Sequence, residues 1–478
     1  MEWDTVIGLE VHAQLKTQSK LFSGASTAFG ASANSQTCFI DAGFPGVLPV
    51  LNQQAIVMAV QFGLAVKADI NDGSIFERKN YFYPDLPKGY QISQLQKPIV
   101  SNGTLIIELN DGSEKKVTIE RAHLEEDAGK SMHELHSDFS GIDLNRAGTP
   151  LLEIVTTPCL FSAEEAISYL KTLHQLVRFL GICDGNMQEG SFRCDVNLSL
   201  KPKGSTTLGT RTELKNLNSF RFIEKAIAYE QARHQDLLEN GHPINQETRL
   251  YNPDTDTTVA MRDKANENDY RYFPDPDLLP IQVARYQIAE IKSTLPDLPK
   301  KIRQELKNTP SLNDEDIHFI LSSPAVYQFY KEIKSHCNSA REKMIINWIK
   351  GQYTASLNEH HLTVETAPVS AKSMAKLLDR IEEAVISTNN ARTVFAALWA
   401  KEEEVDLIIE REGLQQTDDK AALEVIIKTL IQQHPEQAAE YKAGKEKLLA
   451  FFVGQIMKQT KGQANPEHIT SLLKKLLV

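Results

Sequence analysis

Cysteine is scarce and scattered in this chain of 478 residues. The five cysteines stand at positions 38, 159, 183, 194 and 337, and no two of them form a Cys-x-x-Cys pair. A closed zinc site and a disulfide framework both need cysteines at short, repeated spacings. The pattern argues against both and is typical of a protein of the reducing cytosol.

Long hydrophobic runs are also missing. The longest apolar stretch, residues 55–66, is too short to cross a bilayer and is interrupted by Gln61. The opening Met1-Glu2-Trp3-Asp4 has neither the basic start nor the apolar segment of a signal peptide. We therefore expect a cytoplasmic protein that does not associate with membranes.

Two common catalytic motifs are absent. The chain contains no Gly-x-Ser-x-Gly elbow, so no nucleophile for acyl transfer is recognisable. Gly129-Lys130-Ser131 resembles the end of a phosphate-binding loop, but that loop needs a glycine five residues earlier, where Leu124 stands. If a nucleotide is used, metal and side chains in another kind of fold must hold its phosphates.

The composition fits a globular protein with a net negative charge. Hydrophobic residues make up 41% and charged residues 24%, enough to build the cores of two to four domains. The net charge is −11, yet residues 442–478 carry seven lysines against two glutamates. This basic end is consistent with local attraction of a polyanion and equally with a solvated helix surface.

Residues 1–293 predict a domain of mixed structure with a largely antiparallel sheet. Asn110-Asp111-Gly112-Ser113 separates two strand-like runs, which is a strong hairpin signal. A helix is expected from Ser162, with Glu165 completing a capping box, to Gly181.

Helical periodicity dominates the rest of the chain. Leu295-Pro296-Asp297-Leu298-Pro299 marks a break, after which we expect an all-helical domain over 294–404. A small helical domain over 405–478 is expected to follow an acidic run at 401–404. The predicted fold class is therefore α+β, with the sheet at the N-terminal end.

Charged side chains share one face of several predicted strands. Glu10 and His12 alternate with apolar neighbours, so they point the same way. The same alternation places on one face two further sets, Arg193, Asp195, Asn197 and Ser199, and Arg211, Glu213 and Lys215. The pattern favours a sheet that cradles a charged ligand, whereas the alternative is an ordinary solvated sheet face.

Three consecutive carboxylates, Glu125-Glu126-Asp127, precede Lys130. Crowded carboxylates repel one another unless a cation or a proton intervenes. Mg²⁺ reaches proteins through a few carboxylates together with substrate phosphates. This segment therefore predicts a phosphate-handling site, and His123 just before it is interpreted as structural.

Residues 78–85 interleave cations with aromatic rings. Lys79 and Tyr83 belong to this segment, in which bases of a single-stranded RNA end could stack while lysines meet phosphate. A loop that packs on the core through its tyrosines and phenylalanines is an equal alternative.

Many long strings of the chain resemble one family. They are Val6-Ile7-Gly8-Leu9-Glu10-Val11-His12, Phe44-Pro45-Gly46-Val47-Leu48-Pro49-Val50, Arg78-Lys79-Asn80-Tyr81-Phe82-Tyr83-Pro84-Asp85, Glu125-Glu126-Asp127-Ala128-Gly129-Lys130, Asp143-Leu144-Asn145-Arg146-Ala147-Gly148-Thr149-Pro150, Glu189-Gly190-Ser191-Phe192-Arg193-Cys194-Asp195, Glu213-Leu214-Lys215-Asn216-Leu217-Asn218-Ser219-Phe220 and Lys461-Gly462-Gln463-Ala464-Asn465-Pro466. In these strings the chain resembles, from end to end, the B subunits of the glutamyl/aspartyl-tRNA amidotransferases, the GatB family.

The resemblance implies an architecture and a reaction. It implies a cradle domain, a helical domain and a YqeY-like tail that grips tRNA, in a heterotrimer with a glutaminase subunit, GatA, and a small subunit, GatC. The implied reaction uses ATP and Mg²⁺ to phosphorylate the side chain of Glu on tRNA(Gln) or Asp on tRNA(Asn). Ammonia then displaces the phosphate, which gives Gln-tRNA(Gln) or Asn-tRNA(Asn).

The resemblance also implies roles for particular residues. Metal ligands would be His12 and Glu126, with Glu10 completing or bridging the site. A second ion, or the orientation of nucleophile and ammonia, would fall to Glu125, Asp195 and Glu213. Contacts with the nucleotide or the aminoacylated tRNA end would fall to Lys79, Tyr83, Lys130 and Arg193.

One departure concerns zinc. Some family members carry a zinc site built from a Cys-x-Cys and a Cys-Pro-x-Cys after the first strand, and the corresponding positions here are Ser23, Ala25, Cys38 and Asp41. One thiolate cannot hold a structural zinc ion, so we expect no zinc.

Two other functions remain open from the residues alone. A metal-dependent phosphoesterase acting on nucleic acid could use the same carboxylates, but it would need no ATP. A non-catalytic tRNA-binding scaffold would tolerate the loss of Glu126 without loss of activity in the assembled complex.

Overall fold

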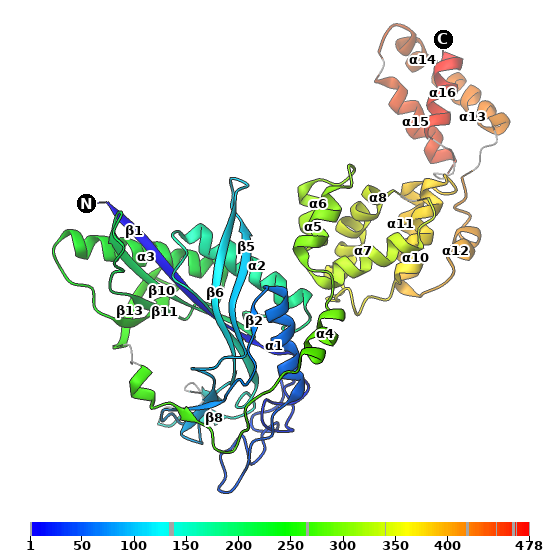
Figure 1. Ribbon diagram of the computed structural model, residues 1–478. Coiled ribbons are helices and arrows are strands. Elements are labelled where there is room, and N and C mark those ends of the chain that lie inside the picture. The colour runs from blue at the N-terminus through cyan, green and yellow to red at the C-terminus, as the bar shows by residue number, and fades with distance from the viewer. Residues whose placement is uncertain are drawn as a thin grey trace. The chain divides into compact units, whose positions relative to one another are not determined.

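The chain folds into two units, which we describe separately. The computed structural model describes residues 2–132, 138–263, 267–339, 341–416, 420–445, 447–460, 464 and 466–477 (Figure 1). Its compact units are Met1–Lys301 and Ile302–Val478. The first combines a large sheet with helices and the second is helical, so the predicted α+β class is confirmed.

The large sheet of the first unit has nine strands within the described residues, in the order β13-β12-β11-β10-β1-β9-β6-β5-β2. Their bounds are β1 Trp3–Gln14, β2 Asp69–Ile70, β5 Val100–Glu108, β6 Glu114–Glu126, β9 Pro150–Thr156, β10 Phe192–Pro202, β11 Thr212–Lys215, β12 Glu247–Asn252 and β13 Thr257–Asp263. Neighbouring strands are antiparallel except for β11 and β12, which are parallel. The prediction of a largely antiparallel sheet is confirmed, with the first strand of the chain near its centre.

Smaller elements complete this unit. One small sheet joins β14 Phe273–Pro274, β3 Glu77–Asn80 and β4 Tyr90–Ser93, and another joins β7 Lys130–Met132 and β8 Gly141–Asp143. The helices are α1 Gln53–Ala65, α2 Ala163–Phe179, α3 Phe220–Glu239, the 3-10 turn η1 Glu267–Tyr270 and α4 Arg285–Ser293.

The core lies between the apolar side of the sheet and its helices. Ile7, Leu9 and Val11 of β1 are buried together with side chains of α1, α2 and α3. Because side chains alternate along a strand, this burial leaves Glu10 and His12 on the opposite face. The packing of the core therefore decides which face of the sheet carries the charged residues.

Local signals in the sequence explain two of these elements. The Ser162 hydroxyl accepts a hydrogen bond from Glu165 N at 3.1 Å and caps α2, and Gly181 after its end has φ +72°. The Glu165 carboxylate accepts from Phe161 N at 2.6 Å, one residue before the cap. The predicted hairpin joins β5 to β6, with Gly112 at φ +82°.

A buried ion pair fastens the segment between β1 and α1. Lys20 Nζ lies 3.0 Å from Asp41 Oδ2, and both side chains are buried. Asp41 also accepts from the Ser23 hydroxyl at 2.8 Å and from Cys38 N at 3.0 Å. Three of the four positions that stand in place of zinc ligands thus meet in one hydrogen-bonded cluster around a lysine. The absence of zinc stays a prediction.

The second unit is built from helices. The boundary between the units, after Lys301, falls within its first helix, α5. The helices are α5 Pro299–Lys307, α6 Asp314–Ile320, α7 Pro324–His336, α8 Glu342–Trp348, the π-helix η2 Ile349–Tyr353, α9 Thr354–Glu359, α10 Ala371–Glu382, α11 Thr388–Ala400, α12 Val405–Arg411, α13 Lys420–Gln433, α14 Pro435–Lys442, α15 Leu448–Gln459 and α16 Pro466–Leu477. The last four of these enclose a hydrophobic core of their own around Ile427, Phe452 and Leu473.

The observed units differ slightly from the predicted domains. The compact units divide the chain after Lys301, and the domain boundaries at 293/294 and 404/405 stay predictions. In the part of the chain that the structure describes, every helix is too short or too polar to cross a membrane.

Candidate active site on the polar face of the sheet

The pairing of β1 with two neighbours brings distant charged residues into rows. His12 lies opposite Glu153 of β9 on one side and Arg193 of β10 on the other. Glu10, one pleat away, lies opposite Asp195 of β10. Directly opposed residues on adjacent strands have neighbouring side chains. The register alone therefore gathers acids and cations on one face.

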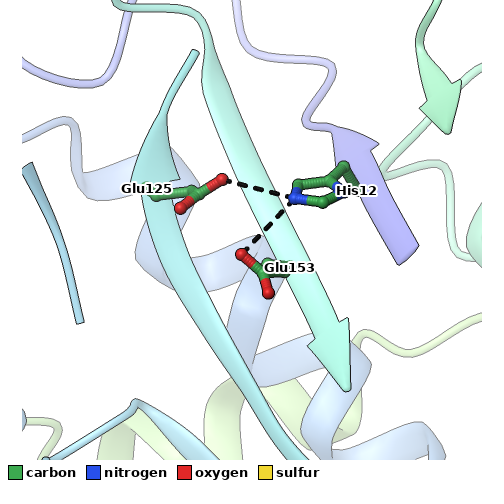
Figure 2. A group of neighbouring side chains, drawn as sticks. All are labelled: His12, Glu125 and Glu153. Carbon is green, nitrogen blue, oxygen red and sulfur yellow. Dashed lines mark ion pairs between the residues drawn. The ribbon is translucent and has the colours of Figure 1, made fainter. Parts of the chain in front are cut away.

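The first group of possible cation ligands is His12, Glu125 and Glu153. His12 Nε2 lies 3.4 Å from Glu153 Oε2 and 3.7 Å from Glu125 Oε1. Figure 2 marks both ion pairs with dashed lines. One ligand atom from each residue lies within 4.8 Å of the other two. His123 Nε2 approaches Glu153 Oε2 at 3.2 Å from the neighbouring strand.

The charges of this first group shift one another's protonation. Burial raises the pKa of Glu153, but His123 and His12 outweigh this effect and hold it well below its usual value. Burial lowers the pKa of His123, but Glu153 and Glu125 outweigh it and raise the pKa to about 9. The pKa of His12 is also raised, because Glu153 and Glu125 outweigh its burial. The neighbouring carboxylates thus make both histidines hold a proton more tightly than a free imidazole does.

The second group is Glu10, Asp195 and Glu213, whose ligand atoms also lie within 4.8 Å of one another. Asn197 Nδ2 donates to Glu10 Oε1 at 2.7 Å, and Thr248 donates to Glu213 Oε2 at 2.7 Å. Lys215 Nζ contacts Asp195 and lies 3.5 Å from Glu213 Oε1.

The ligand atoms of both groups fit a hard divalent cation. One group offers two carboxylates and an imidazole, and the other offers three carboxylates. Mg²⁺ and Mn²⁺ prefer such oxygen-rich sites, whereas a structural zinc site requires four closed ligands. A divalent ion at the first group would compete with a proton for the His12 imidazole.

The two groups line one cavity of about 1000 Å³. Its cationic lining residues are Lys79, Arg121, Arg193, Arg211 and Lys215, and its tyrosines are Tyr81, Tyr83, Tyr270 and Tyr272. Lys79 Nζ lies 4.9 Å from the centre of the Tyr270 ring. Burial lowers the pKa of Lys79, but Tyr272, Glu125 and Glu153 outweigh it and raise the pKa. The cavity can thus hold a polyanion beside stacking surfaces.

Most residues predicted from the sequence meet in this cavity. The structure brings together Glu10, His12, Lys79, Tyr83, Glu125, Arg193, Asp195 and Glu213. Lys130 begins the small strand β7, where it is exposed, and it does not belong to the described cavity lining.

Glu126 points away from Glu125, although the two are adjacent. Within β6 consecutive side chains face opposite sides. The Glu126 carboxylate contacts Lys88 Nζ and accepts from Ile92 N at 2.8 Å. It belongs to neither group of possible cation ligands found among the described residues. The structure therefore does not bring Glu126 to His12.

The sequence interpretation missed Glu153 as a ligand and gave His123 only a structural role. Glu153 is the single charge in the apolar strand Pro150–Thr156, and that isolation was the available signal. The sequence interpretation also grouped Asp127 with Glu125 and Glu126 as one acidic cluster. In the structure, Asp127 Oδ2 lies 2.9 Å from Arg193 Nη2 and forms an ion pair with it. Arg121, which lines the cavity, was not singled out either.

Comparison with known proteins identifies the family of this chain. Residues 5–289 match the model of the GatB/GatE catalytic domain, and residues 328–477 match the model of the GatB domain. The chain is 75% identical to the B subunit of the aspartyl/glutamyl-tRNA(Asn/Gln) amidotransferase of Legionella pneumophila (strain Lens). It is 54% identical to the protein of the same name from Thioalkalivibrio sulfidiphilus and 53% identical to that from Coxiella burnetii (strain CbuG_Q212). Each alignment covers 100% of both chains. The chain therefore belongs to the GatB family of amidotransferase B subunits.

Proposed function

We propose that this chain is the tRNA-binding and carboxylate-activating subunit of a glutamine-dependent tRNA amidotransferase. Its substrates would be Glu on tRNA(Gln) or Asp on tRNA(Asn), as the names of its relatives indicate for those proteins. The observation that carries the proposal is the cavity with two groups of cation ligands on its wall. ATP-dependent activation of a carboxylate requires such a combination of charge stabilisation and positioning.

The proposed reaction has two steps. In the first, an oxygen of the substrate's side-chain carboxylate attacks the γ-phosphorus of ATP, the bond to the bridging oxygen breaks and ADP leaves with the electron pair. In the second, ammonia attacks the carbonyl carbon of the resulting acyl phosphate, inorganic phosphate leaves and the nitrogen loses a proton. The products are an amide on the tRNA, ADP and phosphate.

Six side chains are proposed to hold divalent cations. They are His12, Glu125 and Glu153 for one ion and Glu10, Asp195 and Glu213 for the other. Bound Mg²⁺ would neutralise charge on the phosphates of ATP. Lys215 contacts Asp195 and would offset part of the negative charge of the second group. The group would then not repel an anionic substrate when not all of its metal is bound.

Other lining residues are proposed to bind the substrate. A lysine with a raised pKa stays protonated, so Lys79 would act as a fixed positive charge for the substrate's carboxylate and not as a base. Tyr83 and Tyr270 offer rings for the terminal base of the tRNA. Arg193 lines the same cavity, and one of its guanidinium nitrogens, Nε, is buried with no hydrogen-bond partner. A phosphate oxygen would satisfy that donor.

Partners must supply what the chain lacks. No acyl-transfer nucleophile is recognisable in the sequence, so ammonia would come from a glutaminase subunit such as GatA, with GatC as the small third subunit. The helical C-terminal domain, with its exposed Lys474 and Lys475, would bind tRNA through its phosphates.

Reconstitution with the partner subunits tests the proposal. The complex should convert Glu-tRNA(Gln) or Asp-tRNA(Asn) to the amide only when ATP and glutamine, or ATP and ammonia, are present. The purified single chain should hydrolyse no glutamine. Amide formation without ATP would contradict the proposal, and cleavage of nucleic acid without ATP would instead indicate a two-metal phosphoesterase.

A further inference from the structure

Arg121 lies in the same row of the sheet as Glu10 and Asp195 of the second group of cation ligands. It stands on β6 on the same face as His123 and Glu125, two and four residues away. Arg121 lies opposite Val155 of β9, and Val155 in turn lies opposite Glu10 of β1. Two strand spacings amount to roughly 10 Å between backbones, which an arginine side chain can largely bridge.

The side chain between Arg121 and Glu10 is short and apolar. Val155 is buried and its side chain ends at two methyl groups, so it offers Arg121 no hydrogen-bond acceptor. Arg121 nevertheless lines the cavity. Arg121 thus lies on the wall of the same cavity as both groups of cation ligands.

Arg121 pairs with a solvent-exposed carboxylate, whereas Lys215 and Arg193 of the same cavity pair with more buried ones. Lys215 contacts Asp195, and Arg193 Nη2 lies 2.9 Å from Asp127 Oδ2. Arg121 Nη1 lies 2.9 Å from Glu120 Oε1, and the Glu120 side chain is 53% exposed to solvent. Its Nε is buried and has no hydrogen-bond partner. A buried N–H without an acceptor costs free energy that a bound anion would recover.

A guanidinium in this position matches phosphate. Its planar donors fit two oxygens of a phosphoryl group, and a positive charge beside a transferring phosphoryl group lowers the barrier. We propose that Arg121 binds the phosphate chain of ATP and stabilises the charge that moves to the leaving ADP oxygen. This assignment rests on the proposed function and adds a residue to its phosphate-binding machinery.

The test compares Arg121→Gln and Arg121→Lys in the reconstituted complex. Arg121→Gln should weaken equilibrium binding of a non-hydrolysable ATP analogue about tenfold or more and slow single-turnover acyl phosphate formation about 100-fold. Arg121→Lys should recover part of the nucleotide affinity and little of the rate, because it restores the charge without the fork of donors. The affinity for tRNA should stay within about twofold of wild type.

Glu120→Gln is the matched control, because it removes the exposed partner and leaves the guanidinium in place. It should have wild-type nucleotide affinity and rate. Equal losses in Glu120→Gln and Arg121→Gln would show that the ion pair only supports the strand, and would overturn the proposal. Wild-type nucleotide affinity and rate in Arg121→Gln would overturn it too, as would a loss confined to tRNA affinity. If the wild-type complex itself fails to amidate with ATP, the proposed function fails, and the nucleotide-binding comparison still decides the role of Arg121.

Discussion

The first unit buries carboxylates in two contrasting ways. Glu230 of α3 is fully buried and is surrounded by donors: its oxygens accept from Thr212 at 3.0 Å and Thr258 at 2.8 Å, and it pairs with Arg233 and His234. Burial raises the pKa of Glu230, but these donors outweigh it and lower the pKa to about 2. This carboxylate is satisfied by the protein itself.

The cavity on the other face of the sheet is arranged differently. It holds two groups of ligands, each with at least two carboxylates, and within each group the ligand atoms lie within 4.8 Å of one another. The charge of Glu153 is balanced by His12 and His123, which can lose their protons. Such crowding is costly unless a cation or a proton balances it. The comparison teaches that a buried acid with enough donors serves the fold, whereas acids that share too few donors mark a place for an ion. Substitution of a cavity carboxylate should therefore reduce activity more than stability, whereas substitution of Glu230 should reduce stability.

The largest effect is expected at Glu125. Glu125→Gln keeps the shape of the side chain and removes one ligand charge. The rate of ATP-dependent activation of the substrate carboxylate should fall by about 100-fold or more, because metal stabilisation of charge is worth several kcal/mol. The melting temperature should change little, since Glu153 remains to hold His12. Activation is measured as acyl phosphate formation, and folding by calorimetry.

Glu126→Gln is the informative companion to this variant. Its carboxylate contacts Lys88 and Ile92 N, so the structure favours a smaller loss than in Glu125→Gln. Near-normal activity in Glu125→Gln together with a severe loss in Glu126→Gln would place the ion where the sequence first suggested.

The next largest effect is expected on stability, at the buried pair of Lys20 and Asp41. Lys20→Met leaves the Asp41 carboxylate buried without its cation, which should cost about 3–5 kcal/mol of unfolding free energy. Hydrogen exchange in β1 and α1 under increasing urea measures this loss. The double change Lys20→Met with Asp41→Leu should restore most of it. A Lys20→Met protein as stable as wild type would show that the segment is held by other contacts.

Glu230 should make stability depend on pH at acidic values. Its folded pKa of about 2 lies below the usual 4.5, so its contribution is complete above pH 4.5 and is lost as the pH falls toward 2. At neutral pH, Glu230→Gln should be less stable than wild type by roughly 3 kcal/mol. Urea unfolding between pH 3 and pH 7 measures this difference. A difference that does not narrow at low pH would contradict the assignment.

The smallest effect concerns exposed charge in the second unit. Lys474 and Lys475 lie on the last turns of α16, and both are exposed. Changing both to Gln should reduce the slope of log affinity for tRNA against log salt by up to about 2, with little change in folding. Filter binding at several salt concentrations gives the slope. An unchanged slope would mean that this end of the chain does not contact the phosphates of tRNA.

Local signals predicted much of the fold. The alternation around Glu10 and His12, the Ser162 cap and the hairpin at Gly112 are set by neighbouring residues, and the structure has all three. The same alternation separates Glu125 from Glu126, although their adjacency in sequence suggested a single cluster.

Glu153 could not be predicted as a partner of His12, because that contact depends on strand order. β9 lies between β1 and β6 in the sheet, although β6 precedes β9 in the chain and β1 is far from both. Pairings between distant strands are decided by the packing of the whole domain, which no local pattern encodes. The sequence indicated the strand that carries Glu153, but it did not indicate that this strand pairs with β1.

The central place of β1 in the sheet has a consequence for synthesis on the ribosome. Glu10 and its hydrogen-bond partner Asn197 are 187 residues apart, and β1 pairs with β9 and β10. The first strand must therefore wait for β9, which ends at Thr156, and for β10, which ends at Pro202, before both of its edges are paired. A ribosome that stalls before Pro202 releases a chain with an open sheet edge and an incomplete ion centre. Such a fragment should aggregate and depend on chaperones, and it should bind no divalent ion at Glu10.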